Sequence, residues 1–281
     1  MNIPLSWSII KRFALKNTYG ISFQDVDGEF PGMNPIYLRK ILVDMVKKGM
    51  LRRISRDNYY ILPLNADPLS YTPDGKQVAK YLMMNMEYYI GYASALRIHG
   101  LIRSTQPQGL EAGEYVAEEY VATTVRKNYT SAEHRGITIH LVKHNALNFF
   151  GYDSFCINSY EEAMVSDLEK TIVDIASKPQ LCGGIVEVGN AIYQAKDRTE
   201  HDKIFLYFRR NMNISAKKRY LFLTDLLGLD WTPDHEWLLK KLGPAVSLLD
   251  PLSVNQGRIQ GKFGLKINVD PDHIKKSILQ H

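Results

Sequence analysis

The sequence contains few cysteines and no long apolar run. Its 281 residues include two cysteines, Cys156 and Cys182, which have no partners at metal-ligand spacing. This usage argues against a disulfide framework and is typical of a reducing cytoplasm. No stretch lacking Asp, Glu, Lys and Arg exceeds ten residues, whereas a membrane-spanning helix needs about 20 apolar residues. We therefore expect no membrane partner.

The beginning of the chain lacks the layout of a signal peptide. The first ten residues carry no positive charge before their apolar part, and Lys11, Arg12 and Lys16 follow it. A secretory signal has the opposite order, with its positive charge first. Together with the cysteine usage, this order predicts a cytoplasmic protein.

The overall composition is that of a globular protein. Apolar residues make up 45% of the chain and charged residues 23%, with 12 prolines and 19 glycines. These proportions exclude disorder, collagen-like repeats and coiled-coil fibres as the main organisation. At roughly 150 residues per domain, the length is sufficient for two domains.

Acidic residues are scarce in the first quarter of the chain. Residues 1–65 hold ten Lys or Arg and five Asp or Glu, a net charge of +5, whereas the remaining residues hold 25 of each sign. The whole basic excess therefore lies in this first quarter. A small basic region attracts polyanions, either nucleic acid or anionic lipid. A solvated positive face without a partner is the alternative interpretation.

The segment 1–65 predicts three helices followed by a hairpin. Apolar spacing predicts a helix over 7–16, and Ser22 is a good N-cap for a short second helix. Asn34, followed by a proline, marks the start of a third helix. Two strands are expected at 51–54 and 59–62. This order of elements is that of a winged helix-turn-helix domain.

The third helix has an apolar face and a basic face. The apolar stripe, at i, i+3, i+4, i+7 and i+8, consists of Leu38, Ile41, Leu42, Met45 and Val46. On a helical wheel, the opposite face holds Ile36, Arg39, Lys40 and Lys47. A helix lying in a major groove needs such a basic face. Val43 is an apolar exception there, suited to a thymine methyl group or simply exposed.

The candidate DNA contacts lie on the third helix and on the hairpin. They are Asn34, Tyr37, Arg39, Lys40, Lys47, Lys48, Arg52, Arg53, Arg56 and Asn58. The helix residues would face the groove, and the hairpin residues would reach phosphates or the minor groove. A protein-binding winged helix remains open, since the fold does not always bind DNA. DNA binding is favoured because the basic residues lie on the side that faces the groove.

The rest of the chain predicts a linker and a mixed domain. Residues 66–75 are rich in Pro, Asp and Gly and predict a linker. Over 76–281 no regular strand–helix alternation is visible, which favours an α+β domain with a small sheet surrounded by helices. Helices are expected at about 76–85, 92–99, 166–177, 184–196, 200–211, 215–228, 234–242 and 271–279, and strands at about 118–125, 137–144, 153–158 and 262–269.

The sequence offers little sign of a metal or cofactor site. His140 and His144 stand four residues apart on a predicted strand, a separation of roughly 13 Å that is too long for one ion. Gly183 and Gly184 are better read as a tight turn than as a phosphate cradle, because no P-loop or dinucleotide-binding fingerprint accompanies them. We expect no cofactor and no metal.

The polar run from Ser166 to Asp174 has a structural and a catalytic interpretation. Ser166 and Glu169 have the spacing of a capping box. Lys170 and Asp174 have that of an i, i+4 ion pair on the solvent side of a helix. The buried stripe would be Leu168, Ile172 and Ile175. Clustered aromatic residues are expected to be core or interface packing: Tyr88, Tyr89, Tyr92, Phe149 and Phe150. Capping is favoured over catalysis.

Three segments, in order, carry a resemblance to a known family. The first is the winged-helix run Leu38-Arg-Lys-Ile-Leu-Val-Asp-Met-Val-Lys-Lys-Gly-Met-Leu-Arg-Arg-Ile-Ser-Arg-Asp-Asn-Tyr59. The second is Tyr89-Ile-Gly-Tyr-Ala-Ser-Ala-Leu-Arg-Ile-His-Gly-Leu101. The third is Val165-Ser-Asp-Leu-Glu-Lys-Thr-Ile-Val-Asp174, followed by Pro179 and the glycine pair. Together they resemble the AbiEi family, the antitoxins and transcriptional repressors of abortive-infection (type IV) toxin–antitoxin systems. The resemblance covers roughly 1–65 and 85–195.

The resemblance implies a repressor whose winged helix binds repeats in the promoter of its own operon. It also implies that the larger domain neutralises a nucleotidyltransferase-type toxin without forming a stable complex with it. No catalytic residue is carried over, so we expect a protein that is not an enzyme. Two other functions stay open at this point. One is an enzyme acting on nucleic acid or nucleotides that the winged helix positions, and the other is a protein-interaction adaptor.

Overall fold

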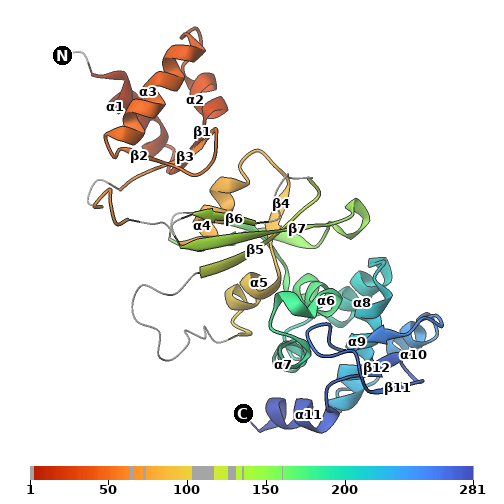
Figure 1. Ribbon diagram of the computed structural model, residues 1–281. Coiled ribbons are helices and arrows are strands. Elements are labelled where there is room, and N and C mark those ends of the chain that lie inside the picture. The colour runs from red at the N-terminus through yellow and green to blue at the C-terminus, as the bar shows by residue number, and fades with distance from the viewer. Residues whose placement is uncertain are drawn as a thin grey trace.

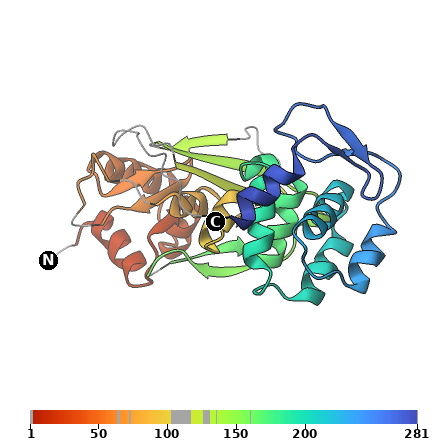
Figure 2. The ribbon, with the colours of Figure 1, turned by 90° about the horizontal axis from the view of Figure 1, so that it is seen from below.

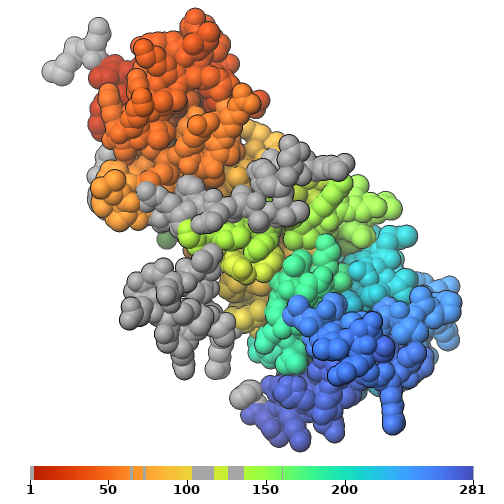
Figure 3. Space-filling view, in the orientation of Figure 1, coloured from red at the N-terminus to blue at the C-terminus, as the bar shows by residue number. Residues whose placement is uncertain are grey.

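The computed structural model describes residues 3–63, 66–71, 74–102, 117–125, 131–134, 136–159 and 161–280. The molecule is elongated (Figures 1 and 3). Residues 3–62, here called the N-terminal unit, form one end, a six-stranded sheet lies in the middle, and helices of the last third of the chain form the other end. Figure 2 shows the same order from a second direction. The protein combines helices with separate sheets, so its fold is α+β, as the sequence predicts.

The N-terminal unit contains three helices and a three-stranded antiparallel sheet in the order β1-β3-β2. Its elements are α1 (Leu5–Ala14), β1 (Gly20–Ser22), α2 (Phe23–Glu29), α3 (Pro35–Lys47), β2 (Leu51–Arg53) and β3 (Asn58–Ile61). Ser22 caps α2 in a capping box with Asp25. The Asn34 side chain caps α3 by accepting the backbone N–H groups of Ile36 and Tyr37. The expected helices and hairpin are confirmed, and β1 is an addition.

The central sheet mixes parallel and antiparallel pairs in the order β6-β7-β5-β4-β9-β8. Its strands are β4 (Tyr88–Ile90), β5 (Ala117–Thr123), β6 (Ser131–His134), β7 (Ile137–Lys143), β8 (Tyr152–Cys156) and β9 (Glu162–Ser166). The pairs β4–β9 and β5–β7 are parallel. Helices α4 (Gly75–Leu82) and α5 (Tyr92–Ile98) pack against it. The sheet is larger than expected, because β4, β6 and β9 were not predicted.

Beyond β7, and apart from β8 and β9, the chain is mainly helical. The helices of this region are α6 (Leu168–Ser177), α7 (Ile185–Ala195), α8 (His201–Arg210), α9 (Ile214–Leu226), α10 (Pro233–Leu239) and α11 (Pro271–Leu279). Short 3₁₀ turns lie at η1 (Ala146–Asn148) and η2 (Pro179–Leu181), and a small sheet joins β10 (Ser247–Leu248), β12 (Leu265–Ile267) and β11 (Arg258–Gln260). One apolar core runs through this region and includes Phe205, Phe208, Leu221 and Phe263. All eight helices expected beyond residue 76 are present.

The glycine pair before α7 is a tight turn, as expected. Gly183 and Gly184 have φ values of 99° and 101°, a backbone conformation that favours glycine. The first helical N–H, that of Ile185, donates to the Asp250 carboxylate at 3.2 Å. A side chain at residue 184 would also crowd that carboxylate. The Asp250 carboxylate thus already accepts from the Ile185 N–H group, to which a phosphate would otherwise bind.

The N-terminal unit packs against α4. The Asn58 amide donates to the backbone oxygen of Tyr81 at 2.8 Å, and the ring of Tyr60 stacks on that of Tyr81 with centroids 6.0 Å apart. Gly20 lies so close to the Tyr81 ring that a Cβ atom there would overlap it. The described part of the expected linker also contacts the unit, since Arg52 donates to the backbone oxygen of Pro68.

Among the described residues, no helix combines the length and the apolar character that crossing a bilayer requires.

Candidate nucleic-acid interface

Helix α3 lies at the surface of the N-terminal unit (Figure 1). Its inner residues Leu38, Leu42 and Met45 are almost completely buried. Because helical side chains repeat every 3.6 residues, this burial turns Lys40 and Lys47 outward, and both are exposed. Neither lysine has an ion pair with another residue of the described ranges. The outward face of α3 therefore carries two lysine charges that form no ion pair within the described part of the chain.

Arg39 lies at the edge of this face and already has partners. Its guanidinium is 3.7 Å from the centroid of the Phe23 ring, and its Nη1 is 2.5 Å from Asp57 Oδ1. Both charged side chains remain about half exposed. An exposed pair of this kind contributes little to stability. Asp57 thus holds Arg39 in place without removing it from solvent.

The three arginines of the hairpin differ in what they contact. Arg53 braces the turn, donating from Nε to the backbone oxygen of Ser55 at 2.9 Å and from Nη2 to that of Arg56 at 2.7 Å. Arg52 is half-buried against the segment that contains Pro68. The Arg56 side chain is exposed. Arg53 and Arg56 thus remain at the surface beside α3, whereas Arg52 is engaged within the chain.

The asparagines of the candidate set have structural partners. Asn58 is 8% exposed and its amide bonds the C-terminal end of α4, so it is not on the surface. Its proposed place beside the DNA is wrong, because strand β3 turns this side chain toward the junction. Asn34 is exposed but its oxygen caps α3. Tyr37 and Lys48 of the candidate set are exposed.

A groove lies between the hairpin turn and the loop that follows α4. It has a volume of about 490 Å³, and its wall includes Arg39, Asp57 and Asn85. The Asn85 amide donates to Ser22 Oγ at 3.2 Å across this junction. The groove therefore lies at the border between the N-terminal unit and the rest of the molecule, next to the basic face of α3.

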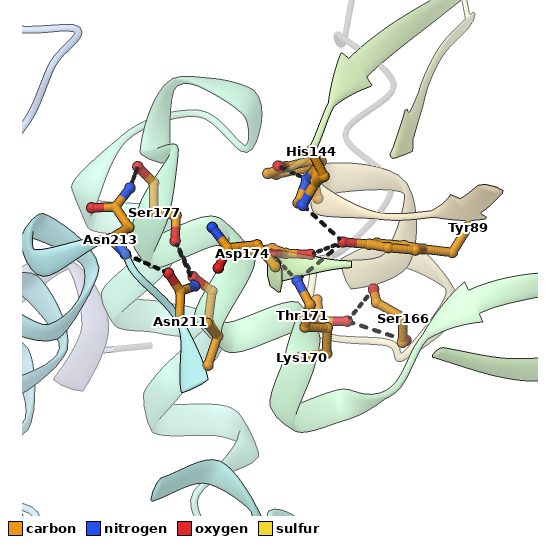
Figure 4. A network of polar contacts seen from close by, with 12 residues as sticks. Tyr89, His144, Ser166, Lys170, Thr171, Asp174, Ser177, Asn211 and Asn213 are labelled. Carbon is orange, nitrogen blue, oxygen red and sulfur yellow. Dashed lines mark hydrogen bonds and ion pairs between the residues drawn. The ribbon is translucent and has the colours of Figure 1, made fainter. Parts of the chain in front are cut away.

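A buried polar network lies between strand β4 and helix α6 (Figure 4). Lys170 of α6 forms an ion pair with Asp174 one turn later, and both side chains are at most 2% exposed. Tyr89 of β4 donates its hydroxyl to Asp174 at 2.8 Å and accepts from Lys170 at 3.0 Å. The hydroxyl of Tyr92 lies 2.7 Å from His144 Nε2. The expected pair is therefore present, but its expected place on the solvent side is wrong.

The expected capping box of α6 is also wrong. The cap is Asp167, whose side chain accepts the backbone N–H of Lys170 at 2.8 Å. Ser166 cannot cap the helix because it is the last residue of β9, and its hydroxyl lies 2.8 Å from that of Thr171. Glu169 instead accepts the backbone N–H of Glu200 at 2.8 Å. The run thus connects α6 to the sheet and to α8.

Burial determines the protonation states in this network. Burial lowers the pKa of His144 to about 4, so the imidazole is neutral near neutral pH. Burial also raises the pKa values of Tyr89 and Tyr92 well above their ordinary range. The pKa of Lys170 is lowered by burial, an effect that the nearby Asp174 opposes. The groups are tied to one another and have almost no exposed surface on which a substrate could bind.

Within the described ranges, one mixed cluster has ligand atoms close enough for a metal ion. The ligand atoms of His201, Asp202 and Asp234 lie within 4.8 Å of one another. Arg209 already pairs with Asp234. His201 and Asp202 are the first two residues of α8, where the helix dipole disfavours a cation. His140 and His144 do not converge, since one stacks on Tyr120 at 4.7 Å and the other bonds Tyr92.

Comparison with known proteins shows a similarity at the level of the fold. No model of a known protein family matches the chain, and no curated protein matches its sequence. The fold is similar to the crystal structure of the RV2827C protein from Mycobacterium tuberculosis, with a TM-score of 0.62. The two chains are 13% identical, and the match covers 94% of this chain and 92% of the other. At this identity the similarity shows the fold and not a shared activity.

Proposed function

We propose that the protein is a DNA-binding transcriptional repressor and the antitoxin of a type IV toxin–antitoxin system. Residues 1–65 would be a winged helix-turn-helix domain, 66–75 a linker and 76–281 the antitoxin domain. The observation that carries the proposal is the exposed face of α3, on which Lys40 and Lys47 have no acidic partner among the described residues. A helix that enters a major groove presents such a face to the phosphates and base edges.

The arrangement around α3 supports this assignment. Helix α2 precedes α3 as the first helix of a helix-turn-helix would, and the hairpin of β2 and β3 occupies the place of a wing. Arg53 and Arg56 lie at the tip of this hairpin and are exposed. These features supply both the groove-facing helix and the phosphate contacts that a winged helix uses.

The burial of the polar run in the larger domain favours a role other than catalysis. Ser166, Glu169 and Asp174, the residues on which an enzymatic interpretation rested, are at most 3% exposed. The Ser166 hydroxyl lies 2.8 Å from that of Thr171, Glu169 accepts from Glu200 and pairs with Lys203, and Asp174 accepts from Tyr89 and pairs with Lys170. The resemblance to AbiEi antitoxins therefore favours a domain that counters a nucleotidyltransferase-type toxin, without a stable complex and without a cofactor. A nucleotidyltransferase-like gene beside this one is the genomic arrangement that the proposal requires.

Titration with the duplex from upstream of its own gene tests the DNA-binding proposal. With about five to seven phosphate contacts, log K should fall with log[salt] at a slope of roughly −4 to −6. A salt-independent affinity would contradict the proposal. So would purification with a stoichiometric protein partner and no affinity for the duplex, which would favour an adaptor.

The double variant Lys40→Ala/Lys47→Ala locates the binding surface. Loss of two phosphate contacts should make the salt slope shallower by about 2 and weaken binding about 10–100-fold near 0.1 M salt. The control is Lys275→Ala/Lys276→Ala on α11, which also removes two exposed lysines. Equal losses in the two double variants would indicate a general charge effect and would reject α3 as the binding surface.

A further inference from the structure

The outermost line of α3 alternates apolar and basic side chains. On a helical wheel, the residues that lie opposite the buried Leu38 are Ile36, Lys40, Val43 and Lys47. Ile36 is 79% exposed and Val43 is 44% exposed, and neither belongs to the apolar core of the N-terminal unit. The two apolar side chains therefore point in the direction in which the lysines point.

We propose that Ile36 and Val43 contact the C5-methyl groups of two thymines, and so determine which DNA sequence the protein prefers. The inference rests on the proposed DNA-binding function and specifies the site at which it acts. An apolar side chain on a groove-facing helix matches the methyl group of thymine, which cytosine and the purines lack in the major groove. Ile36 is the second residue of α3, and the N-terminal residues of a recognition helix reach the base edges.

The spacing of the two side chains predicts the spacing of the thymines. Ile36 and Val43 are seven residues apart, which at 1.5 Å per residue is about 10.5 Å along the helix. Base pairs rise about 3.4 Å each. A helix lying along the groove therefore places the two thymines about three base pairs apart.

The charge pattern favours DNA over other occupants of this face. Lys40 separates the two apolar side chains and Lys47 follows them, so no continuous apolar stripe forms. A partner helix or a lipid surface would bury a continuous stripe, whereas a major groove offers base edges on its floor and phosphates along its rims. The only acidic residue of α3, Asp44, is half-buried and lies to one side of this line.

The experiment replaces thymine by deoxyuridine, which removes only the methyl group. The duplex is the tightest binder selected by the full chain from a random-sequence pool. Each thymine is replaced in turn and the Kd is measured. At two positions about three base pairs apart, the loss of one buried methyl group should weaken binding about 3–5-fold. At other thymines the Kd should not change.

Two variants assign the thymines to side chains. Ile36→Ala should bind the unmodified duplex about 10-fold more weakly and lose its sensitivity to deoxyuridine at one position, and Val43→Ala should do so at the other. The control is Leu15→Ala, which removes an apolar side chain that is 75% exposed at the end of α1. It should keep both the affinity and the two sensitive positions.

The possible outcomes separate this inference from the function on which it rests. Tight, salt-sensitive binding that is unaffected by deoxyuridine at every position would overturn the inference and leave DNA binding intact. Absence of duplex binding would overturn both. Binding to phosphatidylcholine vesicles that contain phosphatidylserine, lost in Ile36→Ala without any deoxyuridine effect, would assign the apolar side chains to a lipid surface and would also overturn it.

Discussion

Helices α3 and α6 use lysine in opposite ways. On α3, Lys40 and Lys47 are exposed and have no acidic partner among the described residues. On α6, Lys170 is completely buried and is tied to Asp174 and Tyr89. The first arrangement leaves charge available to a partner, and the second uses charge to join a helix to a sheet. A lysine on a helix thus predicts function only once its surroundings are known.

The energetic consequences of the two arrangements differ as well. An exposed charge is solvated in the folded and the unfolded chain, so its removal changes stability little. A buried ion pair has lost its water, and deleting one partner leaves the other charge uncompensated. Substitutions on α3 should therefore act on binding, and substitutions on α6 should act on folding.

The largest expected effect follows from Lys170→Ala. The variant leaves Asp174 buried without its cation and should lower the free energy of unfolding by about 3–5 kcal/mol, as measured by urea denaturation. Lys275→Ala, at an exposed position of α11, should change it by less than about 0.5 kcal/mol. The DNA affinity of the folded fraction should equal that of the wild type. A loss as small as that of Lys275→Ala would show that the pair is not buried in solution.

The next effect is a pH dependence from His144. Its pKa in the folded state is about 4, below the ordinary value of 6.5. The unfolded chain therefore takes up the proton first, and stability falls as the pH drops from about 6.5 to 4. The shift corresponds to a loss of roughly 3 kcal/mol over this interval.

Urea denaturation at several pH values measures this loss. His144→Gln, which cannot titrate, should show a smaller decrease in stability toward acid than the wild type. Burial likewise lowers the pKa of His235 to about 4, so part of the decrease should remain in the variant. Parallel curves for the wild type and His144→Gln would contradict the assigned protonation state.

A smaller effect on stability is expected from Asn58→Ala, which lies at the junction with α4 and not on the proposed DNA-binding face of α3. Asn58→Ala removes the amide that bonds the end of α4 and should cost about 1–2 kcal/mol of stability, with no change in the Kd for DNA. Asn255→Ala, at an exposed site, should change neither. A weakened DNA affinity at unchanged stability would indicate instead that Asn58 contacts DNA.

The smallest effect sharpens the role of Arg39. Asp57→Asn removes the carboxylate that pairs with Arg39 and that would also repel phosphate. Because an exposed pair is worth up to about 1 kcal/mol, its removal should strengthen DNA binding about 2–5-fold with little change in stability. The affinity should return to the wild-type value in Asp57→Asn/Arg39→Ala. Weaker binding by Asp57→Asn alone would mean that the pair positions Arg39 for contact.

The helices could be predicted from the sequence because their information is local. Asn34 and the stripe from Leu38 to Val46 define α3 within one short segment of the chain. The strands β1 and β4 have three residues each, too few for an alternation to show. They form because their partners β3, β5 and β9 provide hydrogen bonds from elsewhere in the chain. Such pairing leaves no local pattern.

The two sites differ in the same way. The basic face of α3 follows from helical periodicity alone, and Lys40 and Lys47 lie where it predicts. The position of Lys170 depends on Tyr89, which stands 81 residues earlier. Two indications were nevertheless present in the sequence. Leu168 and Ile172 stand two residues before and two residues after Lys170. The tyrosines of β4 and α5 carry hydroxyl groups that require partners when buried.

Gly20 lies at the contact between the N-terminal unit and helix α4. Its backbone lies against the face of the Tyr81 ring, in a space that has no room for even one methyl group. A DNA reader on a loose tether could adapt to half-sites at many separations. Under the proposed function, this contact limits how the N-terminal unit can turn on α4, so paired copies should prefer operators whose half-sites lie at one separation.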